Sequence, residues 1–201
     1  LYSPQSAEAF YNLACEILEP EDVSIQEAKV AANFLVATQM LDKSINTMLP
    51  QILKVASIDS RIDYSRFIRE QLYKYVSATS DAELAMRGVS YMLSKVNTRE
   101  QRERILESLY QDLGTSNSQF ASQISTYLGI LAAETADFNT AAKHFLNAYN
   151  SNPYNVVAFE KLSEVSPDFV TVPLIAPYLR RKITLNPYSL EMALDFADYA
   201  Y

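Results

Sequence analysis

The chain has 201 residues, of which 49% are hydrophobic and 20% charged, a balance typical of a folded protein rather than a disordered one. Its formal net charge of −7 disfavours nucleic acid and anionic membrane surfaces as partners, because both are negatively charged. A single cysteine, Cys15, and a single histidine, His144, exclude an intrachain disulfide, a cysteine-based zinc site and a paired-histidine metal motif.

Glycine is rare in this chain, with only three residues. That leaves few positions for tight hairpins or a glycine-rich phosphate loop, so an all-α fold is favoured. No apolar run of about 18 residues occurs, and the first residues lack the pattern of a signal peptide. We therefore expect a soluble chain without membrane insertion, for which a cytoplasmic location is favoured.

Three helices are predicted in the first quarter of the chain. Apolar residues recur at helical spacing up to Leu18. Ser24 and Glu27 form a capping-box pattern that predicts a second helix, running to about Leu41. The next amphipathic stripe contains Pro50, which predicts either a kinked helix or a helix that begins near Leu49.

Three further helices are predicted before residue 115. The first covers about 64–78. Ser80 and Glu83 suggest a second capping box, which opens a helix to about Lys95. The third follows Asn97-Thr98 and ends at Gly114, a residue common after helix ends. We group residues 1–115 as N-terminal helical pairs with irregular, repeat-like spacing.

Residues 122–155 carry the clearest pattern in the sequence. It predicts helices at about 119–135 and 139–151, the second capped by Asp137. Gly129 and Ala141 carry little or no side chain, so we expect the two helices to pack closely against each other there. The packing positions of the pattern are Leu128, Gly129, Ala141, Phe145, Ala148 and Pro153.

The pattern returns 34 residues later, where Asn152-Pro153-Tyr154 is repeated as Asn186-Pro187-Tyr188. Residues 156–189 form a degenerate unit whose second helix is expected to start late, near Ala176. Residues 190–201 are predicted to be the first helix of a truncated unit. Because the sequence also starts without methionine, we expect a fragment of a longer protein.

The packing positions of residues 122–155, together with Pro187, resemble the signature of the tetratricopeptide repeat, a helix-turn-helix unit of about 34 residues. The resemblance implies a right-handed α-α superhelix of antiparallel helix pairs, with residues 118–201 continuing the N-terminal pairs as one solenoid of about eleven helices. It implies a non-catalytic scaffold for protein–protein interaction, without a cofactor.

The resemblance also implies a binding groove on the concave surface, lined by residues of successive first helices. A basic protein or peptide partner is the hypothesis, because four of these residues are acidic and none is basic. Thr126 and Ile130 stand where the carboxylate-clamping class of the family has lysine and asparagine, so that activity is not implied. The groove residues are Gln123, Thr126, Ile130, Val157, Glu160, Glu164, Glu191, Leu194 and Asp198.

Alternatives to the scaffold remain open at this point. One is a structural repeat module within a larger protein or assembly, and a less favoured one is an enzyme with a carboxylate-lined groove. His144 has no motif partner and Cys15 lies on an apolar helix face, so both are predicted to be packing residues rather than catalytic ones. The apolar face of residues 190–201 predicts self-association through the last helix.

Overall fold

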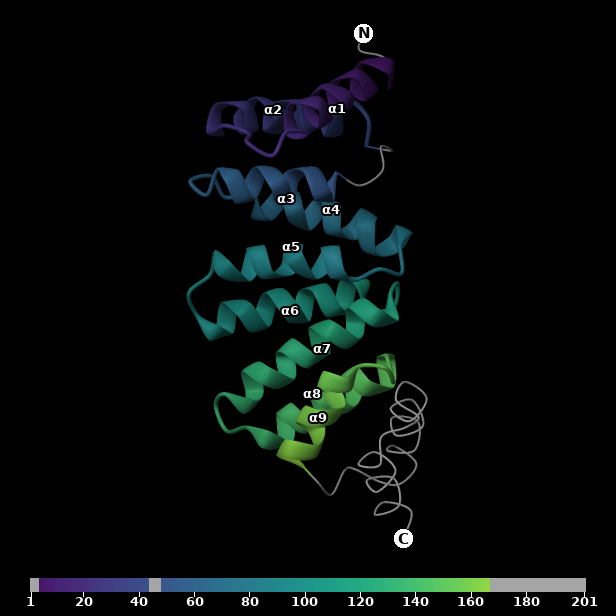
Figure 1. Cartoon of the computed structure of the whole chain (residues 1–201). Helices are drawn as coiled ribbons and strands as arrows, with labels where there is room; N and C mark the ends of the chain where they lie inside the picture. Colours follow the sequence, from purple (N-terminus) through teal and green to yellow (C-terminus); the bar gives the residue numbers. More distant parts are fainter. Residues whose placement is uncertain (1–3, 44–47, 167–201) are drawn as a thin grey trace, which may run out of the picture. The chain divides into compact units, whose positions relative to one another are not determined.

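The computed structural model describes residues 4–43 and 48–166, and this part of the chain is all-helical (Figure 1). The chain divides into two compact units, Leu1–Thr98 and Arg99–Tyr201. The predicted all-α fold class is thus confirmed for the described residues. The helices are α1 (Pro4–Leu18), α2 (Ile25–Leu41), α3 (Leu49–Ile58), α4 (Ser65–Ala78), α5 (Glu83–Ser94), α6 (Arg99–Leu113), α7 (Ser118–Ala133), α8 (Phe138–Ser151) and α9 (Val156–Val165).

Two of the predicted helix starts in the first unit are confirmed. At α2 the backbone N–H of Ser24 donates to the carboxylate of Glu27 (2.8 Å), and the N–H of Glu27 donates to Ser24 Oγ (3.3 Å), which completes the capping box. α3 begins at Leu49, with Pro50 in its first turn. Proline is harmless there, because the first N–H groups of a helix have no intrahelical acceptor.

The capping box predicted at α5 is wrong. Ala82 is the N-cap residue of this helix and makes no side-chain cap hydrogen bond. The N–H of Glu83 instead donates to the carboxylate of Asp81 (2.9 Å), and the N–H of Asp81 donates to Thr79 Oγ1 (3.1 Å). Short-range turns of this kind compete with capping, and here they replace the role predicted for Ser80.

In the first unit each helix packs against the next one along the chain, and alternate helices also meet. α3 packs against both α1 and α2, and α5 packs against both α3 and α4. Alanines at Ala28, Ala31 and Ala32 are buried on α2, which allows α1 to approach closely. Thr38 Oγ1 donates to the carbonyl of Ala7 across this contact (3.4 Å).

Gln71 is a fully buried polar residue that joins three segments of the first unit. Its Oε1 accepts the N–H of Met48 just before α3 (2.8 Å), and its Nε2 donates to Gln39 Oε1 on α2 (3.0 Å). Buried amides are stable only when such hydrogen bonds are made. Gln71 therefore fixes α4 against the start of α3.

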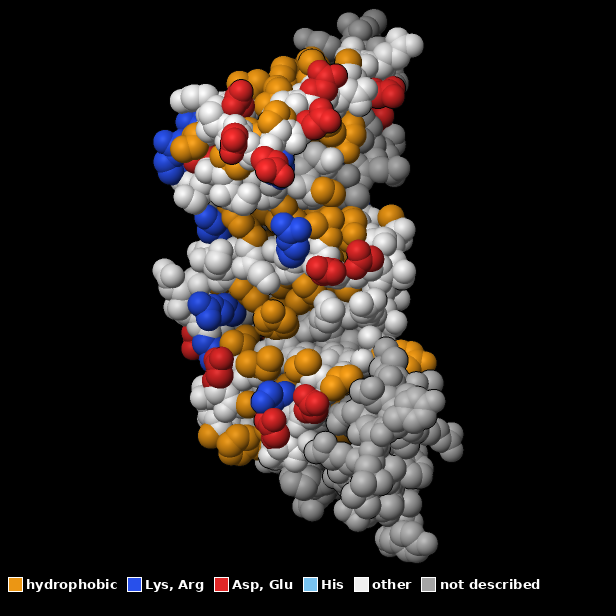
Figure 2. Space-filling model, in the orientation of Figure 1, with side chains coloured by type: hydrophobic (Ala, Val, Ile, Leu, Met, Phe, Trp, Pro, Cys, Tyr) orange, Lys and Arg blue, Asp and Glu red, His pale blue; other side chains and the backbone are white. Residues whose placement is uncertain are grey.

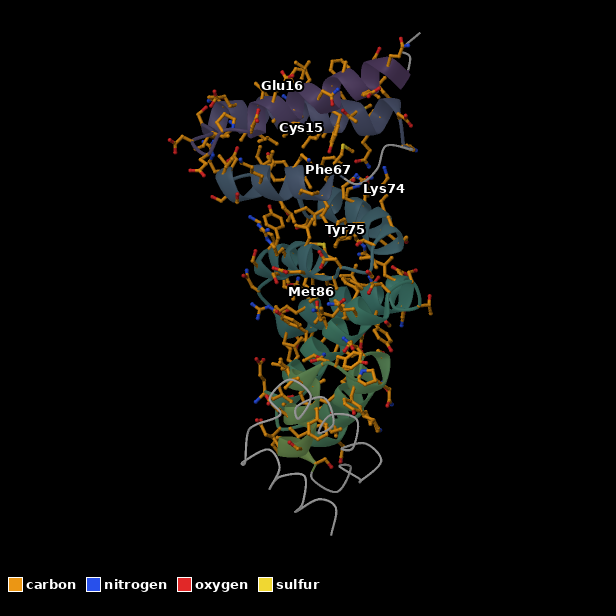
Figure 3. All side chains as sticks on the ribbon, turned by 45° about the vertical axis from the view of Figure 1, so that its right-hand side comes forward. Cys15, Glu16, Phe67, Lys74, Tyr75 and Met86 are labelled. Atoms are coloured by element: carbon orange, nitrogen blue, oxygen red, sulfur yellow. The ribbon has the colours of Figure 1, made fainter. Side chains whose placement is uncertain are left out.

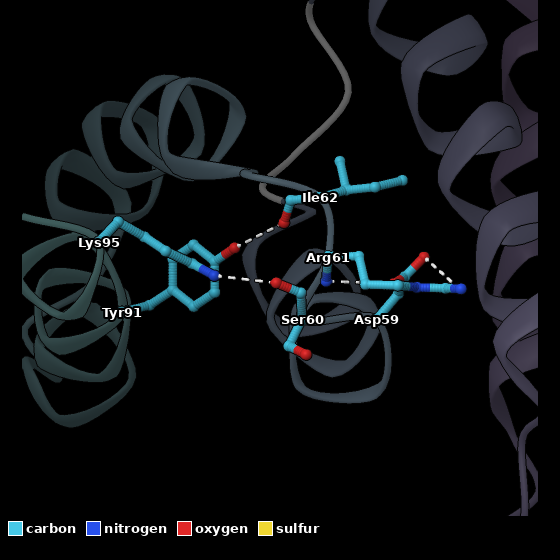
Figure 4. A network of polar contacts seen from close by, with 6 residues as sticks. All are labelled: Asp59, Ser60, Arg61, Ile62, Tyr91 and Lys95. Atoms are coloured by element: carbon cyan, nitrogen blue, oxygen red, sulfur yellow. Dashed lines mark hydrogen bonds and ion pairs between the residues drawn. The ribbon is translucent and has the colours of Figure 1, made fainter.

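A second polar network holds the turn between α3 and α4 against α5 (Figure 4). Tyr91 Oη accepts the N–H of Tyr64 and donates to the carbonyl of Ile62, both at 3.2 Å. Lys95 Nζ lies 4.8 Å from the centre of the Tyr91 ring and donates to the Ser60 carbonyl (3.3 Å). These contacts order the turn without an apolar core of its own.

Asp59 at the end of α3 has a fully buried side chain that pairs with Arg61, with Oδ1 and Nε 2.9 Å apart (Figure 4). The hydrogen bond from Arg61 lowers the pKa of Asp59 below its usual value, and Lys29 on α2 adds a weaker effect in the same direction. The ionised carboxylate is thus the stable form in the folded chain.

The second unit is built around α7, which packs against α6, α8 and α9. Three side chains cap its helices in the same way, each accepting the N–H three residues ahead: Asn117 from Phe120 (2.9 Å), Asp137 from Thr140 (3.2 Å) and Asn155 from Ala158 (3.0 Å). The predicted Asp137 cap is confirmed. α6, which the sequence analysis grouped with the N-terminal pairs, belongs to this unit.

Gly129 is a point of close contact between α7 and α8, and its nearest neighbour differs from the predicted one. A Cβ atom on Gly129 would lie 2.6–2.9 Å from three ring atoms of Phe145, not against Ala141. Ala141 and Phe145 are both fully buried and belong to one cluster with Leu162 of α9. An aromatic ring, rather than a small side chain, thus fills the space over the glycine.

The remaining packing positions divide into two kinds. Leu128 and Ala148 are buried as predicted, whereas Pro153 is exposed in the turn after α8. Pro187 and the two last predicted helices lie outside the described residues, so the self-association predicted for residues 190–201 stays a prediction.

We predict that Gln71→Leu lowers the free energy of unfolding by about 1–3 kcal/mol, because the buried N–H of Met48 and the amide of Gln39 lose a partner. Urea denaturation measures the change. The matched control is Gln26→Leu at an exposed position of α2, which we expect to be nearly neutral. Equal stability of Gln71→Leu and the parent chain would show that these hydrogen bonds do not hold α4 against the start of α3.

We predict that Gly129→Ala destabilises the chain, although alanine inside a helix normally gains roughly 0.5–1 kcal/mol over glycine. Gly129→Leu should cost about 1–3 kcal/mol or more through overpacking. In a Phe145→Leu background the cost of Gly129→Ala should shrink, because the ring that the new methyl group meets is gone. Thermal melts of the parent chain, Gly129→Ala, Phe145→Leu and the double variant test this coupling, and a melt of Gly129→Leu tests the overpacking. A stabilising Gly129→Ala would exclude the close contact with the Phe145 ring.

Candidate partner-binding surface on α7 and α9

α7 is buried on most of its circumference and reaches solvent along one strip. Gln119 is exposed, Gln123 and Ile130 are half-buried, and Tyr127 keeps 40% of its surface accessible. These residues are three or four positions apart, so they share one face of the helix. Within the described part of the chain, this strip is where most of the accessible side chains of α7 lie.

α9 packs beside α7 and continues the strip at the positions 34 residues further on. Val157 is 51% exposed, Lys161 is half-buried and Glu164 is exposed. Lys161 Nζ and Glu164 Oε2 form an ion pair at 2.6 Å. We define the α7/α9 strip as Gln123, Tyr127, Ile130, Val157, Lys161 and Glu164.

Thr126, a predicted groove residue, is buried in a hydrogen-bond network instead. Its Oγ1 donates to the carbonyl of Ser122 (2.8 Å) and accepts Nδ2 of Asn155 (2.9 Å). Asn155 Nδ2 also donates to Ser122 Oγ (2.8 Å), which in turn donates to the carbonyl of Ala148 (2.6 Å). Thr126 therefore holds the start of α9 against α7 and is not available to a partner.

Two other predicted groove residues of α7 are partly buried. Ile130 packs against the cluster that contains Phe145 and Leu162. Gln123 is half-buried, and its Oε1 atom is buried without a hydrogen-bond partner in the described part of the chain. Because this oxygen is buried, a partner can donate to it only if the Gln123 side chain turns outward.

Two of the four predicted acidic groove residues lie in the described part of the chain. Glu160 and Glu164 are exposed on α9, and Glu164 is paired with Lys161. Glu191, Leu194 and Asp198 lie outside the described residues. The described strip is thus a mixture of aromatic, aliphatic, amide and oppositely charged side chains.

Sequence reasoning missed Tyr127 and Lys161. Both lie four residues after a residue that was predicted, Gln123 in one helix and Val157 in the other. Spacing by four residues keeps to one helix face as well as spacing by three does. An available signal was the position of Tyr127, four residues after the predicted groove residue Gln123 on the same helix.

The two reactive side chains singled out in the sequence occupy half-buried positions. Burial lowers the pKa of His144 below its ordinary value, while the carboxylates of Glu107 and Glu103 on α6 act in the opposite direction. Cys15 Sγ accepts Nε2 of Gln51 at 3.7 Å. Within residues 4–43 and 48–166, no three His, Cys, Asp or Glu side chains lie together as a metal site would require.

Comparison with known proteins gives no match: no protein-family model, no curated protein and no solved structure is similar to the chain. None of the helices that the structure describes has the length and apolar character needed to cross a membrane.

We predict that Asn155→Ala detaches α9 from α7, because one side chain both caps α9 and binds Ser122 and Thr126. The loss should be about 1–3 kcal/mol in unfolding free energy, combining a lost cap with buried hydroxyls left unpaired. Amide exchange should rise throughout α9. Asn150→Ala, at an exposed position of α8, is the control. Unchanged protection of α9 would show that the network is dispensable.

Proposed function

We propose that the chain is a non-catalytic scaffold of tetratricopeptide-like helical repeats that binds a protein or peptide. The observation that carries this proposal is the contact between alternate helices, α1 with α3 and α3 with α5 in the first unit, and α7 with α9 in the second. In a superhelix of this type, each pair stacks on the next pair through its first helix. The first helices then share one surface, which the right-handed solenoid places on its concave side.

The composition of the α7/α9 strip supports an extended peptide as the ligand. Tyr127 and Val157 are the most exposed hydrophobic residues of the strip and can anchor apolar side chains. If the half-buried Gln123 side chain turns outward, its amide can offer a donor and an acceptor to the backbone of the peptide. Glu160 and Glu164 favour lysine or arginine between the apolar anchors, which retains the basic partner expected from the sequence.

We predict that peptides of about 12 residues, roughly 40 Å when extended, can be selected from a random display library on the full chain. Tyr127→Ser with Val157→Ser should weaken the selected peptides at least about tenfold, or 1.4 kcal/mol, because both apolar anchors are lost. The matched control is Phe138→Ser with Tyr154→Ser, which removes exposed aromatic rings of the same unit that are not part of the strip.

The same peptides test the charge preference. Glu160→Lys with Glu164→Lys should reduce binding of basic peptides more at low salt than at moderate salt, since screening weakens the interaction. Equal binding by this variant and the parent chain at both salt concentrations excludes a basic preference. Equal loss in the anchor variant and its control excludes the strip as the binding surface.

A further inference from the structure

The first helix pair carries an apolar face that no described element covers. On α1 the face is made by Phe10 and by three residues spaced four apart, and on α2 by residues three or four apart, so each set lies on one side of its helix. The rings of Phe10 and Phe34 stack at 5.6 Å and join the two sets across the helix contact. We define this α1/α2 outer face as Ala9, Phe10, Leu13, Ile17, Val30, Phe34, Ala37 and Leu41.

Contacts with α3 show that the outer face lies on the opposite side of the pair. Gln51 and Lys54 of α3 donate to Cys15 Sγ and to the carbonyl of Leu18 on α1. Figure 3 shows Cys15 on the side of α1 toward α3 and Glu16 on the outer side. On the outer face, Leu13 and Val30 keep 42% and 46% of their surface exposed.

Acidic side chains lie beside this face, on α1 and in the turn that follows it. α1 has no lysine or arginine, and Glu16 borders Leu13 on its outer side. The turn between the helices contains Glu19, Glu21 and Asp22, all exposed. In Figure 2, red acidic groups stand among orange hydrophobic ones at the upper end of the first unit. The lysine of α2, Lys29, lies toward Asp59 and thus away from the face.

We propose that the α1/α2 outer face binds an amphipathic helix of a partner protein, with lysine or arginine flanking its apolar stripe. α3 shows how the pair accepts such a helix on its other side. Gln51 donates there to Cys15 Sγ, and the ammonium group of Lys54 donates to the carbonyls of Leu18 and Pro20. The partner helix makes the equivalent contacts with Leu13, Val30 and the acidic rim.

Charge decides between this occupant and two others. A second copy of the chain docking through the same face brings two acidic rims together, and like charges repel. An anionic membrane surface is disfavoured for the same reason. A basic helix instead gains from both the apolar face and its rim. This surface is on the first unit and is independent of the α7/α9 strip.

The test uses two labelled synthetic helices of about 18 residues, or five turns, with one leucine stripe in common. Lysines flank the stripe in one peptide and glutamates in the other. Fluorescence anisotropy with the full chain should show the lysine peptide binding at least about tenfold more tightly. Leu13→Ser with Val30→Ser should reduce its affinity at least about tenfold.

Two further variants make the result specific. Val36→Ser with Met40→Ser removes exposed apolar residues from another side of α2 and should leave binding unchanged. Glu16→Lys with Glu21→Lys should reduce or reverse the preference for the lysine peptide. Equal affinity for both peptides, or an equal loss in the Val36/Met40 control, overturns the proposal. Sedimentation showing that the parent chain dimerises, and that Leu13→Ser with Val30→Ser abolishes the dimer, also overturns it in favour of a second copy.

Discussion

The second unit depends on one close contact, that of the Phe145 ring with the backbone of Gly129. Since Gly129 has no side chain, the ring reaches the helix backbone and α8 lies tightly against α7. Ala141 and Leu162 then complete the same buried cluster, which brings α9 onto both helices. The exposed strip of α7 is the part of its surface that α6, α8 and α9 leave uncovered.

Polar joints complement this apolar contact in both units. Asn155 caps α9 and binds two hydroxyl groups of α7, so the start of one helix and the side of another are fixed by a single amide. In the first unit, the amide of Gln71 likewise binds the start of α3 and the side of α2. Buried amides of this kind specify the register of helix packing, because a shifted helix leaves them unpaired.

Local sequence patterns predicted features that depend on neighbouring residues. The Ser24–Glu27 box and the Asp137 cap need only three or four residues to form, and Pro50 restricts the start of α3 through its own geometry. The capping box predicted at Ser80 was wrong because Asp81, one residue closer to the helix, accepts the N–H of Glu83 instead. Local patterns could not predict the burial of Thr126, because it depends on a hydrogen bond from Asn155 at the start of α9, 29 residues further along the chain.

The central claim is that the strip shared by α7 and α9 binds a peptide, and methyl NMR tests it most directly. Titration of a selected peptide into the labelled full chain should shift the methyl resonances of Ile130 and Val157, which belong to the strip on neighbouring helices. The methyl groups of Val36 and Leu146, which are not part of the strip, should stay unchanged. Shifts confined to Val36 or Leu146, with Ile130 and Val157 unaffected, would contradict the account.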